Sequence, residues 1–424
     1  AVQQFNKIID GADDVAQNAY YHLAKGYLEL GRKQEALNAF RNAYQMPYSP
    51  EIRQDALLNY ARLSYEIGNP YEAVPEVLGN FLQRYPEAPE QEEVRALLVD
   101  SYITSRDFEG AMELLEANRS YASAETYQKV AFYRGVELFL SEAYSEALEH
   151  FGKAATTAAA PALTARSLYW KAESAFALGR FDAALAAYSD YASHPAAPGT
   201  EEYPDLAYQQ GYAHFKLQGY AQAASKFRDY TAGAPEGPEK TDAWMRLGDS
   251  YFASRSYRQA ISAYEQALAS GSPERDYAAY QKAMSLGFVG QEEEKRTALQ
   301  AFTDQFPNSS LKDDALFELG NSFVQDGRDE AAITAWDRLL QGYPMSSLVP
   351  AAMMRKGLVY YNAGRNEQAL AVFRELVRAH PNTAQAVQAV QTAKLIYVDL
   401  GRVDDYAAWA RNLDFVEVTD SELE

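Results

Sequence analysis

The side chains in this sequence that could bind a metal ion or transfer a proton are five histidines and 59 aspartates and glutamates. The histidines lie far apart, and none has a second histidine or a carboxylate pair at the short spacing that a metal site uses. We therefore interpret them as half-buried or surface residues, and we predict no metal site and no cofactor. The five are His22, His150, His194, His214 and His380.

Acidic clusters occur at Glu201-Glu202, Glu292-Glu293-Glu294 and Asp313-Asp314. We interpret them as solvated surfaces or helix starts, where carboxylates interact favourably with the helix dipole. The chain contains no cysteine, which excludes disulfides and thiolate metal sites. It also lacks a glycine-rich phosphate loop and a nucleophile elbow. The sequence thus predicts a protein that is not an enzyme.

A mostly small residue recurs every 37 residues along nearly the whole chain. Two steps depart from this period, one of 39 and one of 35, so an insertion of two residues is later cancelled. A fixed period of this kind indicates a stack of one repeated unit. The recurring positions, named pulse positions here, are held by Ala36, Ala73, Gly110, Ala147, Ala184, Ala223, Ala260, Lys295, Ala332, Ala369 and Tyr406.

Two further positions accompany the pulse position: a small residue 12 residues earlier and a large one four residues later. Apolar residues at spacings of three and four on both sides of a short break predict two amphipathic helices per unit. The small residues would let the helices approach, and the large ones would fill the space between them. The small residues are Ala24, Ala61, Gly135, Ala172, Gly211, Gly248, Ala283, Gly320 and Gly357. The large ones are Phe40, Val77, Leu114, Phe151, Tyr188, Phe227, Tyr264, Leu299, Trp336 and Phe373.

The break between the two helices is predicted to be a turn in which glycine takes the left-handed conformation that ends a helix. Because no unit could bury its apolar face alone, neighbouring units must stack. The predicted turn residues are Gly31, Gly68, Gly179, Gly219, Gly290, Gly327, Gly364 and Gly401.

One unit carries Trp244, Leu247, Gly248, Tyr251, Ala260, Tyr264, Ala267 and Pro273. This set resembles the tetratricopeptide repeat (TPR). The resemblance implies an all-α fold, a right-handed superhelical solenoid of about eleven antiparallel helix-pair repeats over residues 15–413. The usual period of that family is about 34 residues, so each unit here has about three more, which we expect in the second helix or the following loop.

The two ends of the chain are expected to differ from the repeats. Residues 1–14 resemble the second helix of a preceding partial repeat, with Ala1 and Phe5 at the pulse and large-residue positions. Residues 414–424 form an acidic tail or linker. Our hypothesis is that the chain is a fragment of a larger protein.

Several units end alike, with Tyr85-Pro86, Phe306-Pro307, Tyr343-Pro344 or His380-Pro381. Long units with aromatic-Pro-x-Ser endings resemble the TPR proteins of the bacterial cell envelope. This resemblance favours the bacterial periplasm or cell envelope as the location, with the cytoplasm as the alternative.

The resemblance also implies a binding groove, which first helices line in this family. Aromatic rings with interspersed carboxylates suit an extended or helical peptide that stacks on the rings and pairs through lysine or arginine. The alternative is that these aromatics belong to the repeat pattern and pack one first helix against the next. The candidate groove residues are Glu173, Tyr208, Tyr212, Asp249, Tyr280, Met284 and Asn321.

A known variant of this groove clamps a C-terminal carboxylate with Lys, Asn and Arg on successive first helices. Gly320 and Asn321 preserve only a fragment of that motif, because Phe317 occupies the place of the lysine. Asp249, which follows Gly248, would repel a carboxylate. The sequence therefore disfavours the clamp.

A formal net charge of -20 disfavours nucleic acid as a partner, and no run approaches the roughly 20 apolar residues that cross a bilayer. The leading hypothesis is a non-enzymatic scaffold that binds a protein or peptide in its groove, in a bacterial envelope assembly. The alternative is an architectural spacer in a larger multidomain protein. A helical repeat that reads RNA is disfavoured by the charge.

Three segments depart from the regular repeat. Asn69-Pro70 suits a helix start, but Pro75 lies further in and removes a helical donor, which predicts a kink or a frayed first turn. Residues 193–205 and 231–240 are rich in Pro, Gly and charge. They are predicted to be long linkers, either hinges or simply longer surface loops.

Overall fold

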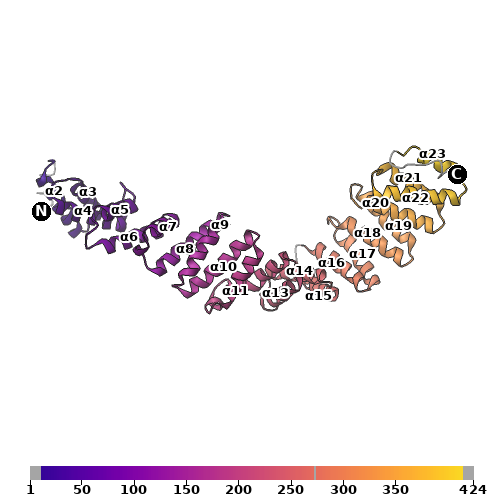
Figure 1. Cartoon of the computed structure of the whole chain (residues 1–424), viewed down its shortest axis with the longest axis horizontal. Helices are drawn as coiled ribbons and strands as arrows, with labels where there is room; N and C mark the ends of the chain where they lie inside the picture. The colour runs from indigo at the N-terminus through magenta and orange to yellow at the C-terminus, as the bar shows by residue number, and fades with distance from the viewer. Residues whose placement is uncertain (1–10, 272–273, 414–424) are drawn as a thin grey trace. The chain divides into compact units, whose positions relative to one another are not determined.

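The computed structural model describes residues 11–271 and 274–413. Within these residues the chain forms α-helices and short 3-10 turns, and no strand. The α-helices follow one another as eleven consecutive pairs (Figure 1). The all-α helix-pair solenoid predicted from the sequence is confirmed. The predicted partial helix in residues 1–14 falls largely, and the acidic tail 414–424 entirely, outside the described residues.

Each pair consists of a first helix and a second helix. The pairs are α2 (Asp14–Glu29) with α3 (Lys33–Gln45), α4 (Pro50–Ile67) with α5 (Val74–Arg84), α6 (Gln91–Thr104) with α7 (Phe108–Ala117), α8 (Ala124–Leu140) with α9 (Tyr144–Thr157), α10 (Pro161–Ala177) with α11 (Phe181–Ser193), α12 (Leu206–Lys216) with α13 (Tyr220–Gly233), α14 (Pro238–Ala253) with α15 (Tyr257–Ala269), α16 (Arg275–Phe288) with α17 (Glu292–Gln305), α18 (Lys312–Gln325) with α19 (Asp329–Gly342), α20 (Val349–Asn362) with α21 (Asn366–Ala379), and α22 (Ala384–Asp399) with α23 (Val403–Ala410).

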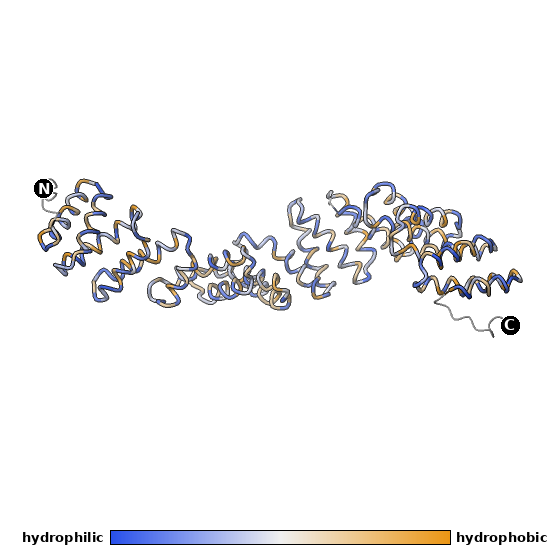
Figure 2. The backbone as a smooth tube through the Cα atoms, turned by 90° about the horizontal axis from the view of Figure 1, so that it is seen from above, coloured by the Kyte–Doolittle hydropathy of each residue, from blue (hydrophilic) through white to orange (hydrophobic). Residues whose placement is uncertain are grey.

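The chain divides into two compact units, residues 1–206 and 207–424. The N-terminal unit contains α2 to α11 and three clusters of buried side chains. The C-terminal unit contains α13 to α23 and most of α12, again with three clusters. Hydrophobic and hydrophilic residues are interleaved along the helices (Figure 2). Each unit therefore has a core distributed along its stack of helices, as expected for a solenoid.

The core is built on contacts between the two helices of a pair. Seven pulse alanines are fully buried, among them Ala36, Ala260 and Ala369. The small residue before the pulse faces the large residue after it: a Cβ added to Gly248 would lie 2.5 Å from the Tyr264 ring. The same close approach joins Gly135 to Phe151, Gly211 to Phe227, Gly320 to Trp336 and Gly357 to Phe373. The predicted role of the small and large positions is confirmed, and the structure shows that they form a matched pair.

The turn between the helices is left-handed, as predicted, but one glycine was misplaced. Seven of the eight predicted glycines have φ between +69° and +79°. Gly219 instead has φ of -77° and caps α13, while the preceding Gln218 takes the left-handed position with φ of 60°. Arg255 occupies the same position in the next repeat, with φ of 59°. The left-handed turn is therefore imposed by the packing of the helices even where no glycine is available.

The prolines near residue 70 shorten one second helix. Helix α5 begins at Val74 with Pro75 in its first turn. Asn69 accepts hydrogen bonds from the backbone N–H groups of Tyr71 and Glu72, so it closes a turn ahead of the helix. The pulse residue Ala73 is then exposed. The expected first turn is therefore absent: residues 70–73 lie outside the helix, and Pro75 stands in the first turn, where it interrupts no helical hydrogen bond.

The first predicted linker, residues 193–205, is a packed loop that contains two 3-10 turns, Ala197–Gly199 and Tyr203–Asp205. Arg166 Nε and Trp170 Nε1 of α10 donate to Glu202 Oε1 at 2.7 and 3.1 Å. Glu202 is buried, so its interpretation as a solvated residue was wrong. The other two acidic clusters lie in the first turns of α17 and α18, as predicted.

The second predicted linker, residues 231–240, is shorter than expected. Helix α13 extends to Gly233 and α14 begins at Pro238, which leaves only residues 234–237 outside helices. Gly233 is the last residue of α13, Gly237 caps the start of α14, and Pro238 is the first residue of α14, a position that suits the fixed φ of proline.

Candidate functional site

Tyrosine hydroxyls on first helices donate hydrogen bonds to carboxylates on the next first helix along the chain. Such bonds occur in both units. The carboxylates involved are therefore occupied by groups of the protein itself. The pairs are Tyr21 with Asp55, Tyr65 with Asp100, Tyr208 with Asp242 and Tyr361 with Asp399.

Two of the candidate groove tyrosines belong to this set of bonds. Tyr208 and Tyr212 of α12 both donate to Asp242 Oδ2 of α14. Arg246 Nε lies 3.3 Å from both the Tyr212 hydroxyl and Asp242 Oδ1. Burial, followed by the nearby Asp242, raises the pKa of both phenols above the ordinary value. Both hydroxyls thus stay protonated and join α12 to α14.

Asp249, a candidate groove carboxylate, is only 9% exposed. It accepts hydrogen bonds from Arg246 Nη1 at 2.8 Å, and from the hydroxyls of Tyr264 and Tyr277 at 2.9 Å each. Burial raises the pKa of Asp249, although these partners oppose the shift. Its oxygens are therefore engaged inside the repeat.

Glu173 has a similar environment in the N-terminal unit. Its Oε1 accepts a hydrogen bond from the hydroxyl of Tyr188, which is fully buried. Burial raises the pKa of Glu173, and hydrogen bonds from Tyr188 and Tyr169 act against that rise. The carboxylate joins the first helix α10 to the second helix α11.

Tyr280 and Met284 lie one turn apart on α16, and both are half-buried. The Tyr280 ring meets Phe302 of α17 edge to face, with centroids 6.0 Å apart. Burial raises the pKa of its phenol, and the carboxylate of Asp314 adds to the rise. These two side chains retain accessible surface on the first-helix side of the repeat.

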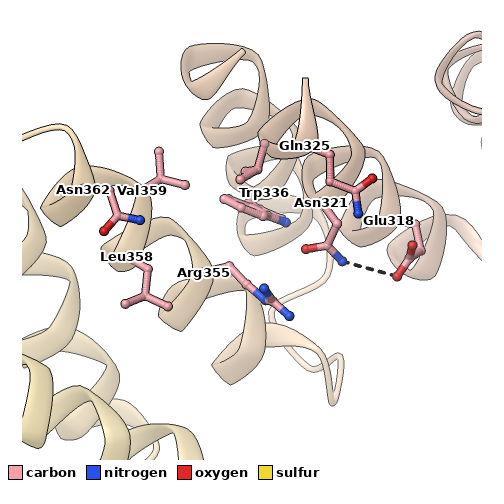
Figure 3. A pocket seen from close by; sticks show the side chains of 9 residues that line it. Glu318, Asn321, Gln325, Trp336, Arg355, Leu358, Val359 and Asn362 are labelled. Atoms are coloured by element: carbon pink, nitrogen blue, oxygen red, sulfur yellow. Dashed lines mark hydrogen bonds between the residues drawn. The ribbon is translucent and has the colours of Figure 1, made fainter. Parts of the chain in front are cut away.

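Asn321 lines a pocket of about 390 Å³ between α18, α19 and α20 (Figure 3). Its Nδ2 donates to Glu318 Oε1 at 3.3 Å, whereas its Oδ1 is buried and has no hydrogen-bond partner among the described residues. Arg355 of α20 also lines this pocket (Figure 3). It makes no ion pair with any described residue. The remaining lining residues are Val324, Gln325, Trp336, Leu358, Val359 and Asn362.

A buried lysine forms an ion pair with Glu318, one of the residues that line this pocket. Lys295 occupies a pulse position, is 8% exposed, and reaches Glu318 Oε2 at 3.2 Å. Gly287 makes room for its stem, because a Cβ there would lie 2.8 Å from Lys295 Cδ. The ion pair fixes Glu318, which in turn holds the Asn321 amide.

The sequence alone did not identify Arg355, Glu318 or Lys295 as parts of a site. Glu318 and Arg355 both lie 14 residues before a pulse position in consecutive repeats. That shared position was a usable signal, because equivalent residues of stacked repeats lie side by side.

In residues 11–271 and 274–413 no three histidine or acidic side chains come close enough to hold a metal ion. None of the described helices combines the length and the apolar character needed to cross a bilayer. Of the histidines, His214 has a pKa lowered first by burial and then by Lys226.

Comparison with known proteins agrees with this repeat geometry. The family model described as "Tetratricopeptide repeat" matches residues 21–89, 134–199, 208–275, 245–286, 296–347 and 317–384, which together exceed half of the chain. No curated protein sequence matches the chain.

Several solved structures are similar to parts of the chain. The C-terminal part of a TPR repeat-containing protein from Cytophaga hutchinsonii is 15% identical, covers 60% of this chain and 97% of its own, and has a TM-score of 0.44. YrrB, described as a TPR protein with an unusual peptide-binding site, is 20% identical over 44% of this chain and 91% of its own, with a TM-score of 0.37. MamA from Desulfovibrio magneticus is 20% identical over 43% of this chain and 94% of its own, with a TM-score of 0.35.

The family model places its matches in both compact units, on the helix pairs whose small and large positions pack against each other. On this evidence the chain belongs to the tetratricopeptide repeat family.

Proposed function

We propose that this chain is a non-enzymatic interaction scaffold that holds a segment of a protein or peptide on the first helices of its C-terminal unit. The observation that carries the proposal is the buried Asn321 Oδ1, which lacks a donor among the described residues and belongs to a side chain that lines an open pocket. A buried acceptor without a partner costs about 1–3 kcal/mol, so a ligand that supplies an N–H or O–H group gains that amount.

The chemistry of the pocket matches a peptide main chain. A peptide bond offers one N–H donor and one C=O acceptor. Asn321 Oδ1 would accept from the N–H, and Arg355 would donate to the C=O. Leu358 and Val359 supply apolar contact for a neighbouring side chain.

Of the candidate groove residues, we assign direct contact with the segment to Tyr280, Met284 and Asn321. These three lie on the consecutive first helices α16 and α18. Glu173, Tyr208, Tyr212 and Asp249 act as the framework, because their polar atoms already bond within the protein. The framework residues would shape the surface without pairing with a ligand.

The experiment is selection of binders from a random dodecapeptide phage library on the intact chain, followed by fluorescence anisotropy with each recovered peptide. We expect Asn321→Ala and Arg355→Ala each to weaken binding about ten-fold, the loss of roughly one hydrogen bond to a charged or buried group. Arg374→Ala, which removes an exposed arginine from the second helix α21, is the matched control and should change nothing. If the recovered peptides bind both pocket variants as tightly as the wild type, the binding site lies elsewhere.

A second candidate function is an architectural spacer within a larger protein. It is favoured by the tyrosine–carboxylate bonds between first helices, which use groove positions to stiffen the stack. In that case the library yields no specific binder. Deletion of one 37-residue unit would then impair the parent protein, while the double variant Asn321→Ala, Arg355→Ala would not.

We place the scaffold in a bacterial envelope assembly, because of the aromatic-Pro endings of its long repeats. A protein partner rather than nucleic acid follows from the formal charge of -20. Cell fractionation of the tagged parent protein tests the location, and recovery in the cytosol alone would contradict it.

A further inference from the structure

A second pocket lies on the second-helix side of the C-terminal unit, away from Asn321. It has a volume of about 670 Å³ and is formed by α13, α14 and α15. Ligand pockets in proteins have volumes of about 300–1,000 Å³, so it is large enough for one big side chain and the backbone on either side. The lining residues are Arg228, Trp244, Leu247, Tyr251, Arg258, Gln259, Ser262, Ala263 and Gln266.

The floor of this second-helix pocket is apolar. Trp244 and Tyr251 come from α14 and are both half-buried, with Leu247 between them. On α15 the facing residues are the small Ser262 and Ala263. Elsewhere in the chain the residue 16 positions before the pulse is Tyr20, Leu57, Val94, Ala131, Leu168, Ala207, Ala279, Leu316, Met353 or Val390. An indole at this position is therefore found in this repeat alone, and it lines the pocket with the part of its surface that does not pack against the core.

The rim of the pocket is cationic. Arg228 and Arg258 are exposed, and neither forms an ion pair with a carboxylate among the described residues. The Arg228 guanidinium donates a long hydrogen bond to Ser225 Oγ, at 3.5 Å. None of the nine lining residues is acidic, in a chain of formal charge -20.

Arg258 stands at a position where five other repeats carry an acidic residue. It lies two residues before the pulse, where other repeats carry Asp182, Glu293, Glu330, Glu367 or Asp404, or an uncharged residue. Three of those acids pair with arginines: Glu293 with Arg296, Glu330 with Arg365, and Glu367 with Arg402. Arg258 makes no such pair within the described ranges and stays available to an outside anion.

We propose that the second-helix pocket is a docking site for an acidic segment of a partner protein that carries one large apolar side chain. The apolar side chain packs against Trp244 and Tyr251, where aromatic rings supply most of the binding area. Carboxylates on either side of it pair with Arg228 and Arg258, and guanidinium groups hold carboxylates in a fixed bidentate geometry. Gln259 and Gln266 offer amides to the backbone of the segment.

This site is independent of the proposed peptide surface at Asn321. The two pockets are lined by different residues on different helices. They also differ in chemistry, because the first presents an unsatisfied acceptor and the second an apolar floor with two cations.

The test uses the intact chain and a fluorescein-labelled dodecapeptide made of Asp, Glu, Ser and Gly with one central Phe. We expect saturable binding with a Kd of roughly 10–100 μM, weakened about ten-fold when the Phe is replaced by Ala. A peptide with Lys in place of the acids should not bind, because like charges at an interface are repulsive.

Two protein variants locate the binding. Arg258→Glu places an acid at this position, as in five other repeats, and should weaken binding at least about ten-fold. Ser262→Tyr fills the pocket from an exposed position without altering the core, so it should abolish binding while circular dichroism and the melting temperature stay unchanged. Arg355→Glu makes the same charge change at the first pocket and is the control, with no loss expected.

Three outcomes would overturn the proposal: no saturable binding of the acidic peptide, equal binding of the lysine peptide, or loss of binding in Arg355→Glu but not in Arg258→Glu. Analytical ultracentrifugation of the chain alone provides a further check. If the chain dimerises and Ser262→Tyr makes it monomeric, the pocket is occupied by a second copy and not by an acidic partner.

Discussion

Glycines on the first helices are required where a large ring from the second helix packs directly against the backbone. Gly135 faces Phe151 in this way, and a Cβ there would lie 2.8 Å from the ring. Gly152, on the second helix of the same repeat, has open space instead, because no described neighbour lies within 4 Å of where its Cβ would be. The same substitution should therefore have opposite effects at these two positions.

We expect Gly135→Ala to lower the free energy of unfolding by about 1–3 kcal/mol, because it overpacks a filled core. Gly152→Ala should raise it by about 0.5–1 kcal/mol, because alanine is the better helix former. Urea denaturation of the two variants measures both changes. Equal effects would show that the contact between glycine and ring does not limit the packing.

The buried carboxylate of Glu173 predicts a pH dependence. Its folded-state pKa is raised above the ordinary value by burial, so the folded state holds the proton more tightly than the unfolded state does. Stability is then fully present below the unfolded pKa and is lost as pH rises through the folded pKa. Glu173→Gln does not titrate, so its stability relative to the wild type should increase as pH rises from about 4.5.

Denaturant titrations of both proteins from about pH 3 to pH 8 measure this difference. Glu149→Gln is the control, because the pKa of that exposed carboxylate is lowered, first by its hydrogen bond with Lys153. The stability of Glu149→Gln relative to the wild type should fall as pH rises toward about 4.5 and stay constant above it. A constant difference between Glu173→Gln and the wild type would contradict the proposed burial of the charge.

At the scale of single residues, the sequence predicted which positions are small and which are large. It did not predict that Asp249 and Glu173 lie among tyrosine hydroxyls. We expected both carboxylates to be available to a ligand, because first helices line the binding groove in this family. Only the packed structure shows that Tyr188 and Tyr264 of the same repeats, and Tyr277 of the following repeat, reach them.

At the scale of elements, the start of a first helix is tied to the loop that follows its own second helix. The residue 19 positions before the pulse makes this connection. Gln128 donates to Ala154 O at 3.0 Å and accepts from Ala160 N at 2.7 Å. Asp313 accepts from Ser346 Oγ at 2.6 Å. The same connections are made by Gln17 with Ala43, Met46 and Ser49, and by Asp276 with Ser309.

These bonds explain the serine in the aromatic-Pro-x-Ser endings. Ser346 Oγ also accepts from Leu348 N at 3.1 Å, so it caps the approach to α20 while it holds α18. We expect Asp313→Ala and Ser346→Ala each to cost about 1–2 kcal/mol, with a coupling of about 1 kcal/mol in the double variant.

Thermal or urea unfolding of the two single variants and the double variant measures this coupling. Thr334→Ala is the control, since its hydroxyl bonds to Glu330 O of its own helix, and it should be nearly neutral. Additive losses at Asp313 and Ser346 would mean that their hydrogen bond does not join the two segments.

At the scale of the whole chain, stability should depend on nearest neighbours in the stack. Trp336 is fully buried among α18, α19 and α20 residues of the C-terminal unit. We expect Trp336→Ala to cost about 3–5 kcal/mol and to accelerate amide hydrogen exchange in α18 to α20, while α2 to α5 in the N-terminal unit keep their protection.

Hydrogen exchange followed by mass spectrometry measures this pattern. Trp336→Phe, which keeps a ring against Gly320, should show a much smaller effect in the same helices. Uniform loss of protection over both units would show that the chain unfolds as one cooperative body rather than as neighbouring repeats.

The sequence by itself determined the repeat, the helix pairs and the family. These follow from local periodicity, since each repeat must bury the same faces against its neighbours and so keeps the same residue sizes at the same positions. It also predicted an irregular start of the second helix near Pro75, because proline acts on its own backbone. Only the tertiary structure decided which polar side chains are available. Within the described part of the chain, Asn321 Oδ1 lacks a donor and Arg258 lacks a carboxylate, while Asp249 is fully engaged. Much of this pairing joins residues 15 to 38 positions apart, and the distances between them are not encoded by the periodicity.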